Sequence, residues 1–458
     1  MKSPILSGTI ILTLALGVLN AVYAASATWS ANPVNNDWYT AKNWIPVTVP
    51  NGPDDVATIG ESSITSILLP EQSVTELDSV IFQAHAFIIV SNGASLTFEG
   101  IGALGGFIAA IDPELGSSVT FRHSSTSDVL FGMHGHVTFR DHSTAGNDIT
   151  CYGGENMDEE GAVLSFLDQS AAVGIDIIIN PGIFGGRPSA VYFNHESTAD
   201  NLELTMVGDG ILDISGHKPP GLPVDTLGYI GGVIYLGNNN LTVTKHQIPN
   251  GFSGIIQDGG VYGGTGGSLT KVGSDTDTLS LTGENSYTGG TFVEGGILLA
   301  NNRNGSATGT GPIQVNAGTL GGIGTISGAV TIGSGSGSGA FLAPGINRRA
   351  SLTILSSLTF NADGVYNCRL NANTVMSGKV TTEGVTINSG ARFFFVTRGN
   401  QPLPQGTVFT VINNSSPNPI AGTFANLPDG GIITINGNNF QASYEGSDGN
   451  DLTLTVVP

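Results

Sequence analysis

Short runs in which apolar and polar residues alternate recur along most of the chain. Alternation with a period of two predicts strands that bury one face, and the Gly, Asn, Asp and Ser clusters between the runs predict turns. No segment keeps a helical apolar period over ten positions, so helices are not expected. The clearest runs are Val119–Phe121, Val137–Phe139, Ile175–Ile177, Leu279–Leu281, Val330–Ile332 and Leu452–Val456.

Two sequence patterns repeat at short intervals. The pattern Phe-x-(Asp/His)-x-Ser starts at Phe121, Phe139, Phe166 and Phe193, and its last two intervals are equal. A second pattern, Val-x-x-Gly-x-Leu, starts at Val293 and recurs at Val315. Periods of about 20–30 residues indicate a solenoid, and these units are too short for a βαβ crossover of ~30 residues. A hairpin array would not place Phe and Ser at one position per unit, so we predict an all-β, right-handed parallel β-helix with N- and C-terminal caps.

The repeats and the composition of the ends divide the chain. Between positions 75 and 420, units of this length would form roughly 14 coils, stacked ~4.8 Å apart into a rod near ~70 Å long. The predicted segments are a signal peptide (1–24), an N-terminal cap (25–74), a β-helix with the Phe-x-Asp/His-x-Ser repeats (75–267), a further β-helix segment (268–400) and C-terminal capping strands (401–458).

Bulky aromatic residues gather at both predicted ends. Trp29, Trp38 and Trp44 lie close together in the sequence, and such side chains can cover an exposed strand edge. The alternative is a carbohydrate-binding surface that stacks sugars on the three Trp faces. The C-terminal segment contributes Phe409, Phe424, Phe440 and Tyr444.

The beginning of the chain, 1–24, predicts export. Lys2 supplies a positive n-region, Ile5–Leu19 is an apolar run, and small residues precede an expected cut after Ala24. The alternative is an uncleaved anchor, although the run is shorter than the ~20 residues of a membrane span. No second such run follows, so we expect no transmembrane segment in the mature chain and a secreted, extracellular or outer-membrane-associated location.

Composition narrows the function classes. There are 36 acidic and 15 basic residues, and the net charge of −21 opposes binding to nucleic acid. The 67 glycines disfavour a helical protein, and the 40% of apolar residues can build a core. Cys151 and Cys368 lie far apart in the sequence. We expect two buried small hydrophobic residues; the alternative is a bridge, which an oxidising compartment would permit.

One segment resembles a known family. Residues 269–298, which include Leu279-Ser-Leu-Thr-Gly283-Glu-Asn285-Ser-Tyr287-Thr-Gly289, resemble the autotransporter-associated β-strand repeat, also called the passenger-associated transport repeat. Segments 29–57 and 422–454 are similar to the opening and closing parts of large secreted proteins with this repeat. The resemblance implies a bacterial, passenger-type β-helix in which the repeat assists export and folding. The chain departs from the family in one respect, because the stretch after Ala391 is too short and too rich in Pro and Gly for the outer-membrane barrel of a classical autotransporter. We therefore expect anchoring through a partner, or release.

One set of equivalent residues on consecutive repeats is a candidate catalytic site. Asp141, Asp168 and His195 hold the same motif position in three consecutive units. Stacking would place carboxylates ~4.8 Å apart, close to the ~5–5.5 Å of a retaining glycosidase, or in position for calcium. Such residues more often satisfy the backbone of turns, and we favour that interpretation.

Other candidate sites are weaker. Asp54 and Asp55 could bind calcium, but turn and capping duty is favoured. The segment 446–454 resembles a single calcium β-roll repeat, yet one copy is present, so a turn into the last strand is predicted. The tract 333–339 lacks the Lys-Ser/Thr of a phosphate loop and predicts a flexible turn. His134 and His136 share at most one strand face. We therefore assign no catalytic, cofactor-binding or metal-binding residue and expect no cofactor.

Insertions in the repeats are the favoured contact regions. Glu155 and the acidic run 158–160 lie in one of them, and loops that leave a solenoid often carry binding specificity. The three insertions are 153–161, 181–189 and 216–230. We predict a non-enzymatic surface protein in adhesion, surface structure or matrix contact, with surface glycans, cell-surface proteins or a second copy as partners. The alternative is a polysaccharide lyase or glycoside hydrolase that uses the 141–195 face.

Overall fold

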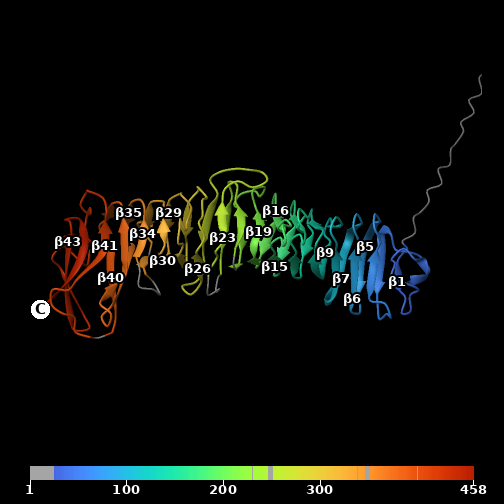
Figure 1. Ribbon diagram of the computed structural model, residues 1–458, viewed down its shortest axis with the longest axis horizontal. Coiled ribbons are helices and arrows are strands. Elements are labelled where there is room, and N and C mark those ends of the chain that lie inside the picture. The colour runs from blue at the N-terminus through green and yellow to red at the C-terminus, as the bar shows by residue number, and fades with distance from the viewer. Residues whose placement is uncertain (1–24, 229–230, 246–250, 338, 346–350, 400) are drawn as a thin grey trace, which may run out of the picture.

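The molecule is an elongated rod of stacked coils with its two ends at opposite poles (Figure 1). The computed structural model describes residues 25–228, 231–245, 251–337, 339–345, 351–399 and 401–458. Parallel strands form a solenoid of about 14 turns, which confirms the predicted parallel β-helix. The predicted signal peptide, 1–24, lies outside the described residues.

The N-terminal half is dominated by one sheet of 22 strands. It comprises β1 (Ala27–Trp29), β2 (Trp44–Ile45), β3 (Gly52–Ile59), β4 (Ser66–Leu69), β5 (Val74–Phe82), β6 (Ala86–Val90), β7 (Ser95–Pro113), β8 (Ser118–Phe121), β9 (Thr126–Met133), β10 (His136–Phe139), β11 (Thr144–Ala145), β12 (Ile149–Cys151), β13 (Val163–Phe166), β14 (Ala171–Val173), β15 (Asp176–Ile179), β16 (Ala190–Phe193), β17 (Thr198–Asp200), β18 (Glu203–Met206), β19 (Gly208–Asp213), β21 (Thr226–Gly228), β22 (Gly231–Tyr235) and β24 (Ile255–Gln257).

Three sheets continue the rod towards the C-terminus. The first holds β20 (Leu222–Val224), β23 (Asn240–Val243), β25 (Ser268–Lys271), β27 (Thr291–Val293), β29 (Ile313–Val315), β32 (Val330–Ile332), β35 (Leu358–Phe360) and β39 (Val385–Ile387). The second holds β26 (Thr278–Leu281), β28 (Ile297–Ala300), β30 (Gly318–Gly322), β33 (Ala340–Pro344), β36 (Gly364–Asn371), β37 (Met376–Ser377) and β40 (Arg392–Arg398). The third holds β31 (Thr325–Ile326), β34 (Ser351–Ile354), β38 (Lys379–Thr382), β41 (Val408–Asn414), β42 (Ile432–Ile435), β43 (Asn438–Gly446) and β44 (Asp451–Val457).

The Phe repeats stack in register inside the rod. Strands β8, β10, β13 and β16 pair in parallel, so each repeat Phe lies beside the Phe of the next coil. Their rings stack with centroids 4.7, 5.2 and 4.6 Å apart, and Phe98 of β7 extends the stack at 4.7 Å. All of these rings are buried. Parallel pairing in constant register therefore places equivalent repeat residues of successive coils next to each other.

The N-terminal end is closed by the three tryptophans. Trp29 and Trp38 pack edge-on against Trp44, with centroids 5.0 and 4.7 Å apart. Each indole N–H donates to a backbone carbonyl, of Ile64, Pro50 and Trp38 respectively. The rings are at most 1% exposed, which is consistent with a capping role. The alternative, sugar stacking on the Trp faces, is wrong because these faces are covered by protein.

Parallel pairing begins inside the segment predicted as the N-terminal cap. β1 pairs with β2 antiparallel but with β3 parallel, and β3 pairs with β5 in parallel. At the other end β41 pairs with β38 in parallel, and β44, β43 and β42 then add antiparallel strands. Phe424, Phe440 and Tyr444 are buried there, as a cap requires.

The two cysteines occupy the core as small apolar residues. Cys151 and Cys368 are fully buried and form no disulfide, and burial raises the pKa of both thiols. Helical structure in the described ranges amounts to one 3-10 turn, η1 (Ala41–Asn43). None of the helices in that part of the chain is long and apolar enough to cross a bilayer.

Candidate functional site

The residues of the predicted column do stack, at the turn that follows each repeat Phe. Asp141, Asp168 and His195 have φ values of 59°, 59° and 58°, and His123, one coil earlier, has 56°. Asp and His are among the side chains that tolerate the left-handed region best. The repeat therefore selects them for the backbone conformation of this turn.

Their side chains hold the turn of the preceding coil. The N–H of His123 donates to Asp141 Oδ2 at 2.9 Å, that of Asp141 to Asp168 Oδ2 at 3.3 Å, and that of Asp168 to His195 Nδ1 at 3.2 Å. This ladder supports the turn interpretation favoured by the sequence. Across the described residues, no three His, Cys, Asp or Glu side chains converge as a metal ion would need.

The fixed serine of the same repeat points into the rod. Its position is occupied by Ser125, Ser143, Ser170 and Ser197, each at most 1% exposed. Their hydroxyl oxygens have no hydrogen-bond partner in the described part of the chain. The sequence pattern located these residues but gave no indication that their hydroxyls would be buried.

The weaker candidates also serve turns. Asp55 is buried and accepts the N–H of Asn51 at 2.9 Å, whereas Asp54 is exposed. Residues 447–450 form the predicted turn into β44, and Asp451 at the start of this strand accepts the N–H of Asn414, at the end of β41, at 2.9 Å. His136 is exposed, and the His134 ring stacks on Tyr152 with centroids 4.7 Å apart.

The Gly-rich tract is tied to an aspartate of the next coil. Asp363 accepts the N–H groups of Ser334, Gly335 and Gly337 at 3.1, 2.7 and 2.8 Å. Burial alone would raise the pKa of Asp363, but these donors outweigh it and hold the pKa below its ordinary value. The described positions 333–337 form a turn as predicted, but Asp363 holds this turn in place.

Two of the predicted insertions form one compact projection, which we call the loop pair (153–161 and 181–189). Four backbone hydrogen bonds join the loops: Gly154 N–H to Arg187 O at 2.8 Å, Asp158 N–H to Gly185 O at 3.1 Å, Ile183 N–H to Gly154 O at 2.9 Å, and Arg187 N–H to Glu159 O at 2.8 Å. Loops joined in this way support each other, and their conformation is fixed before any partner binds.

Glycines permit this close approach. A Cβ on Gly154 would lie 2.1 Å from the Glu159 carbonyl oxygen, and one on Gly186 would lie 2.1 Å from that of Gly154. A Cβ on Gly182 would lie 1.9 Å from the Gly186 carbonyl oxygen. A larger residue at Gly186 would push the two loops apart, whereas one at Gly154 or Gly182 would disturb the conformation of its own loop.

A carboxylate closes the first loop from within. Glu159 accepts the N–H groups of Glu155 and Asn156 at 2.9 and 2.8 Å, and the Asn156 side-chain amide at 2.9 Å. The bond from the Asn156 side chain, followed by those from the two backbone N–H groups, lowers the pKa of Glu159. Across the pair, Glu160 and Arg187 form an exposed ion pair at 2.5 Å.

The loop pair displays apolar side chains to solvent. Phe184 is 85% exposed, Met157 79% and Ile183 46%. Phe184 also adopts φ = 51°, a backbone region in which a bulky residue is a genuine outlier. Strain of this kind persists where the surrounding structure imposes it, and it clusters at binding and switch sites.

The third predicted insertion, 216–230, does not project over its whole length. Leu222–Val224 and Thr226–Gly228 are strands β20 and β21 within the coils, and positions 229–230 lie outside the described residues. A different segment projects nearby: Val261 and Tyr262 are 70% and 63% exposed. Sequence reasoning missed it because no repeat marks this segment as an insertion.

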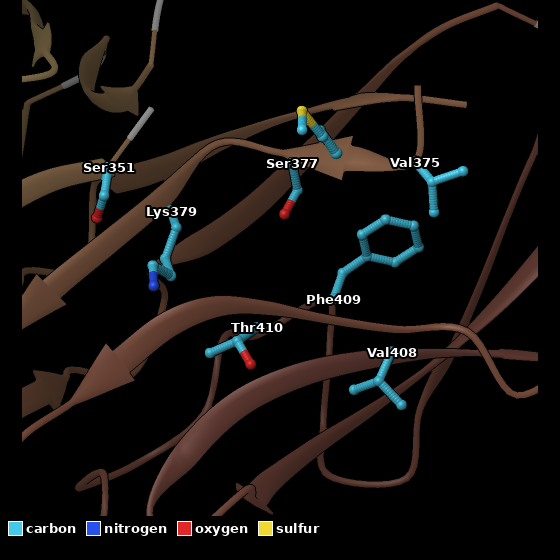
Figure 2. Close-up of a pocket in the computed structure, with 8 residues that line it drawn as sticks. Ser351, Val375, Ser377, Lys379, Val408, Phe409 and Thr410 are labelled. Atoms are coloured by element: carbon cyan, nitrogen blue, oxygen red, sulfur yellow. The ribbon is translucent and has the colours of Figure 1, made fainter. Parts of the chain in front are cut away.

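A shallow pocket lies near the C-terminal end of the rod (Figure 2). It has a volume of about 370 Å³, and its walls come from β34, β37, β38, β41 and the turn before β37. Lys379, Ser351 and Ser377 form a polar side, whereas Val375, Phe409 and Val408 lie together on the other (Figure 2). Val375 has φ = 53°, a strained conformation for a β-branched residue. The sequence held no signal for this pocket, because its walls come from three separate coils.

The segment 269–300 builds its coils from different contacts. Asn285 spans three coils, because its Oδ1 accepts the N–H of Ile256 at 2.7 Å and its Nδ2 donates to the Ala307 carbonyl at 2.5 Å. Tyr287 is buried and its hydroxyl lies 2.6 Å from Thr291 Oγ1. A Cβ on Gly289 would lie 2.1 Å from the Gly266 carbonyl oxygen.

Comparison with known proteins identifies this segment. Residues 269–300 match the family model described as passenger-associated-transport-repeat, so the chain carries this repeat and the predicted resemblance is confirmed. A stretch of 148 residues is 32% identical to the extracellular serine protease of Serratia marcescens. That stretch spans 32% of this chain and 13% of that protein.

Proposed function

We propose that the protein is a secreted or cell-surface β-helix of passenger type that acts in adhesion, surface structure or matrix contact, with the loop pair as its contact surface. Export is supported by the passenger-associated transport repeat at 269–300 and by the partial likeness to a protein named as extracellular. Surface glycans and other cell-surface proteins are the proposed partners.

The loop pair is the observation that carries this proposal. Four backbone hydrogen bonds hold it, yet it exposes Phe184 and Met157 almost completely. Large apolar side chains on a preorganised surface favour binding, because little conformational entropy remains to be lost when a partner arrives. Aromatic residues and methionine are enriched at protein interfaces.

The test is binding by purified 25–458 to intact cells and to an array of glycans. The variant Phe184→Ala with Met157→Ala should lose most of the binding, at least tenfold, with an unchanged circular dichroism spectrum. Val261→Ala is the matched control, since Val261 is similarly exposed on a different loop. Equal binding by the double variant and the wild type would show that the loop pair is not the contact surface.

The proposal assigns no catalytic step to the chain. The alternative is polysaccharide cleavage by the stacked Asp141, Asp168 and His195. Incubation with a panel of neutral and acidic polysaccharides, with and without calcium, distinguishes the two functions. We expect no new reducing ends and no unsaturated products. Turnover that Asp141→Ala or Asp168→Ala abolishes without unfolding the protein would replace this proposal with an enzymatic one.

A further inference from the structure

The loop pair lies along the same corner of the rod as the pocket near the C-terminal end, which we call the Lys379 pocket. Each loop of the pair leads into a strand of the line that contains the Phe stack, namely β13 and β16. That line continues by parallel pairing through β19 and β22 to β24. The turn that carries Val375 leads into β38 in the same way.

Backbone hydrogen bonds connect β24 with β38 along this line. The intermediate steps are Ser286 N–H to Ile256 O at 3.0 Å, Asn285 N–H to Ser306 O at 2.8 Å and Ala307 N–H to Thr325 O at 2.9 Å. β31 then pairs with β34, and β34 with β38. Counted along these pairings, the loop pair and the pocket are about eight coils apart, which corresponds to roughly 38 Å at ~4.8 Å per coil.

The two features are complementary in chemistry. The loop pair exposes Phe184 and Met157 together with the carboxylates of Glu155 and Asp158, whereas Glu160 is already paired with Arg187. The pocket offers the opposite partners, an apolar side at Val375 and Val408 and the ammonium group of Lys379. Val375 and Val408 are 47% and 57% exposed, so the isolated molecule leaves this apolar side open to water. Lys379 takes part in none of the ion pairs within 4 Å that the described residues form.

We propose that two copies of this chain pair side by side and antiparallel, with the loop pair of each molecule seated in the Lys379 pocket of the other. This inference rests on the proposed function in one respect, that the loop pair is a contact surface. Because both features lie on one corner, a two-fold axis midway between them brings both contacts together at once. The interface is then isologous and closed. A parallel arrangement would leave one pocket and one loop pair unfilled at the ends.

Charge sets the conditions for this pairing. Each chain carries a net charge of −21, so two copies repel at low ionic strength. At 0.15 M salt the Debye length is about 8 Å, which screens this long-range repulsion and leaves short-range contacts largely intact. Pairing should therefore be weaker in 10 mM salt than in 150 mM salt.

The first experiment measures mass by sedimentation velocity on 25–458, from about 1 to 100 µM, in 150 mM salt. We expect a concentration-dependent monomer–dimer equilibrium for the wild type. Phe184→Ala and Lys379→Glu should each weaken dimerisation at least tenfold, while Val261→Ala should leave it unchanged. A monomer throughout this range, or a dimer that both variants form normally, overturns the proposal.

The second experiment reports which surfaces meet. Cys151 and Cys368 are buried and free, so an introduced cysteine is the accessible thiol. Mixing Met157→Cys with Val408→Cys under a mild oxidant should give a mixed disulfide-linked dimer faster than either variant alone. Rapid linkage of Met157→Cys to itself would mean that loop pairs meet each other, and would overturn this arrangement.

Failure of this inference can be told from failure of the proposed function. If the wild type is monomeric but Phe184→Ala with Met157→Ala still abolishes cell or glycan binding, the contact surface stands and its partner is another molecule. If Lys379→Glu yields a monomer that binds cells normally, both proposals hold and surface binding does not require the dimer.

Discussion

The coils around the Phe stack and the coils of the passenger-associated repeat form the same rod by different means. In the first region, aromatic rings 4.6–5.2 Å apart fill the interior, and Asp or His side chains hold the turns. In the second, the interior is largely aliphatic, Asn285 ties three coils, and glycines let backbones meet. Stacking in a β-helix therefore needs a constant register and satisfied turns, but no particular side-chain chemistry.

The two solutions differ in what they tolerate. A smaller residue can replace a stacked Phe and leave a cavity. By contrast, a Cβ added at Gly289 would lie only 2.1 Å from the Gly266 carbonyl oxygen. The first region should therefore lose stability in proportion to the volume removed. The second should depend on a few backbone-facing groups, so single substitutions in each region should separate the two.

Removing a ring from the middle of the stack should have the largest effect. Phe166 contacts Phe139 and Phe193 and is fully buried, so Phe166→Ala should cost about 3–5 kcal/mol of unfolding free energy. Urea unfolding followed by circular dichroism measures the loss. Phe184→Ala is the matched control, because this exposed Phe should change stability by less than about 0.5 kcal/mol. Similar losses for both variants would contradict the role of the stack.

Asn285 should rank next. Asn285→Ala leaves the Ile256 N–H and the Ala307 carbonyl without these partners, which should cost about 2–4 kcal/mol. The same unfolding experiment applies, with the exposed Asn238 replaced by Ala as the control. If Asn285→Ala unfolds at the wild-type urea concentration, the amide does not tie the repeat coils together.

A buried lysine in the repeat should make stability depend on pH. Burial lowers the pKa of Lys271 from 10.5 to about 8, and its ammonium donates to the Thr244 and Val272 carbonyls. Between these two values the unfolded chain binds more protons than the folded one, so stability should rise with pH, by roughly 1–3 kcal/mol.

Thermal unfolding at pH 7 and pH 10 measures this change. Lys271→Met has no titrating group at this position, so its pH dependence should be flatter than that of the wild type by that amount. If the stabilities of the wild type and Lys271→Met depend equally on pH, folding does not lower the pKa of Lys271.

The buried serine of the Phe repeats should matter least. Because the Ser170 hydroxyl is buried without a partner in the described part of the chain, Ser170→Ala should be neutral or stabilising, within about 1 kcal/mol. Calorimetry resolves the difference as a small upward shift in melting temperature. A clear loss of stability would show that the hydroxyl does form a hydrogen bond.

The repeat period carried most of the fold prediction. The phenylalanines at 121, 139, 166 and 193 are unequally spaced, and they can share a register only if each coil returns the chain to the same place while loops absorb the difference in length. The turn residues were predictable for the same reason, since Asp141 and Asp168 recur beside that Phe. The cap was predictable from three tryptophans within a short segment, because such bulk must be buried somewhere.

The candidate site was predictable only in part. The insertions 153–161 and 181–189 were evident as extra residues between repeats, but their mutual hydrogen bonds and the exposure of Phe184 were not. The insertion 216–230 was misjudged, because its alternating residues enter the coils as β20 and β21. A surplus in length does not say whether the extra residues project or fold back into a sheet.

The sequence alone determined the coil, since local alternation and a recurring motif suffice to specify strands, turns and an apolar interior. Only the tertiary structure decided what the surface presents. The Lys379 pocket joins side chains from 351 to 410, and the loop pair faces the same corner about eight coils away. Which residues share a corner of the rod depends on the number of residues in each coil. That number is summed over the whole rod, so no local pattern contains it.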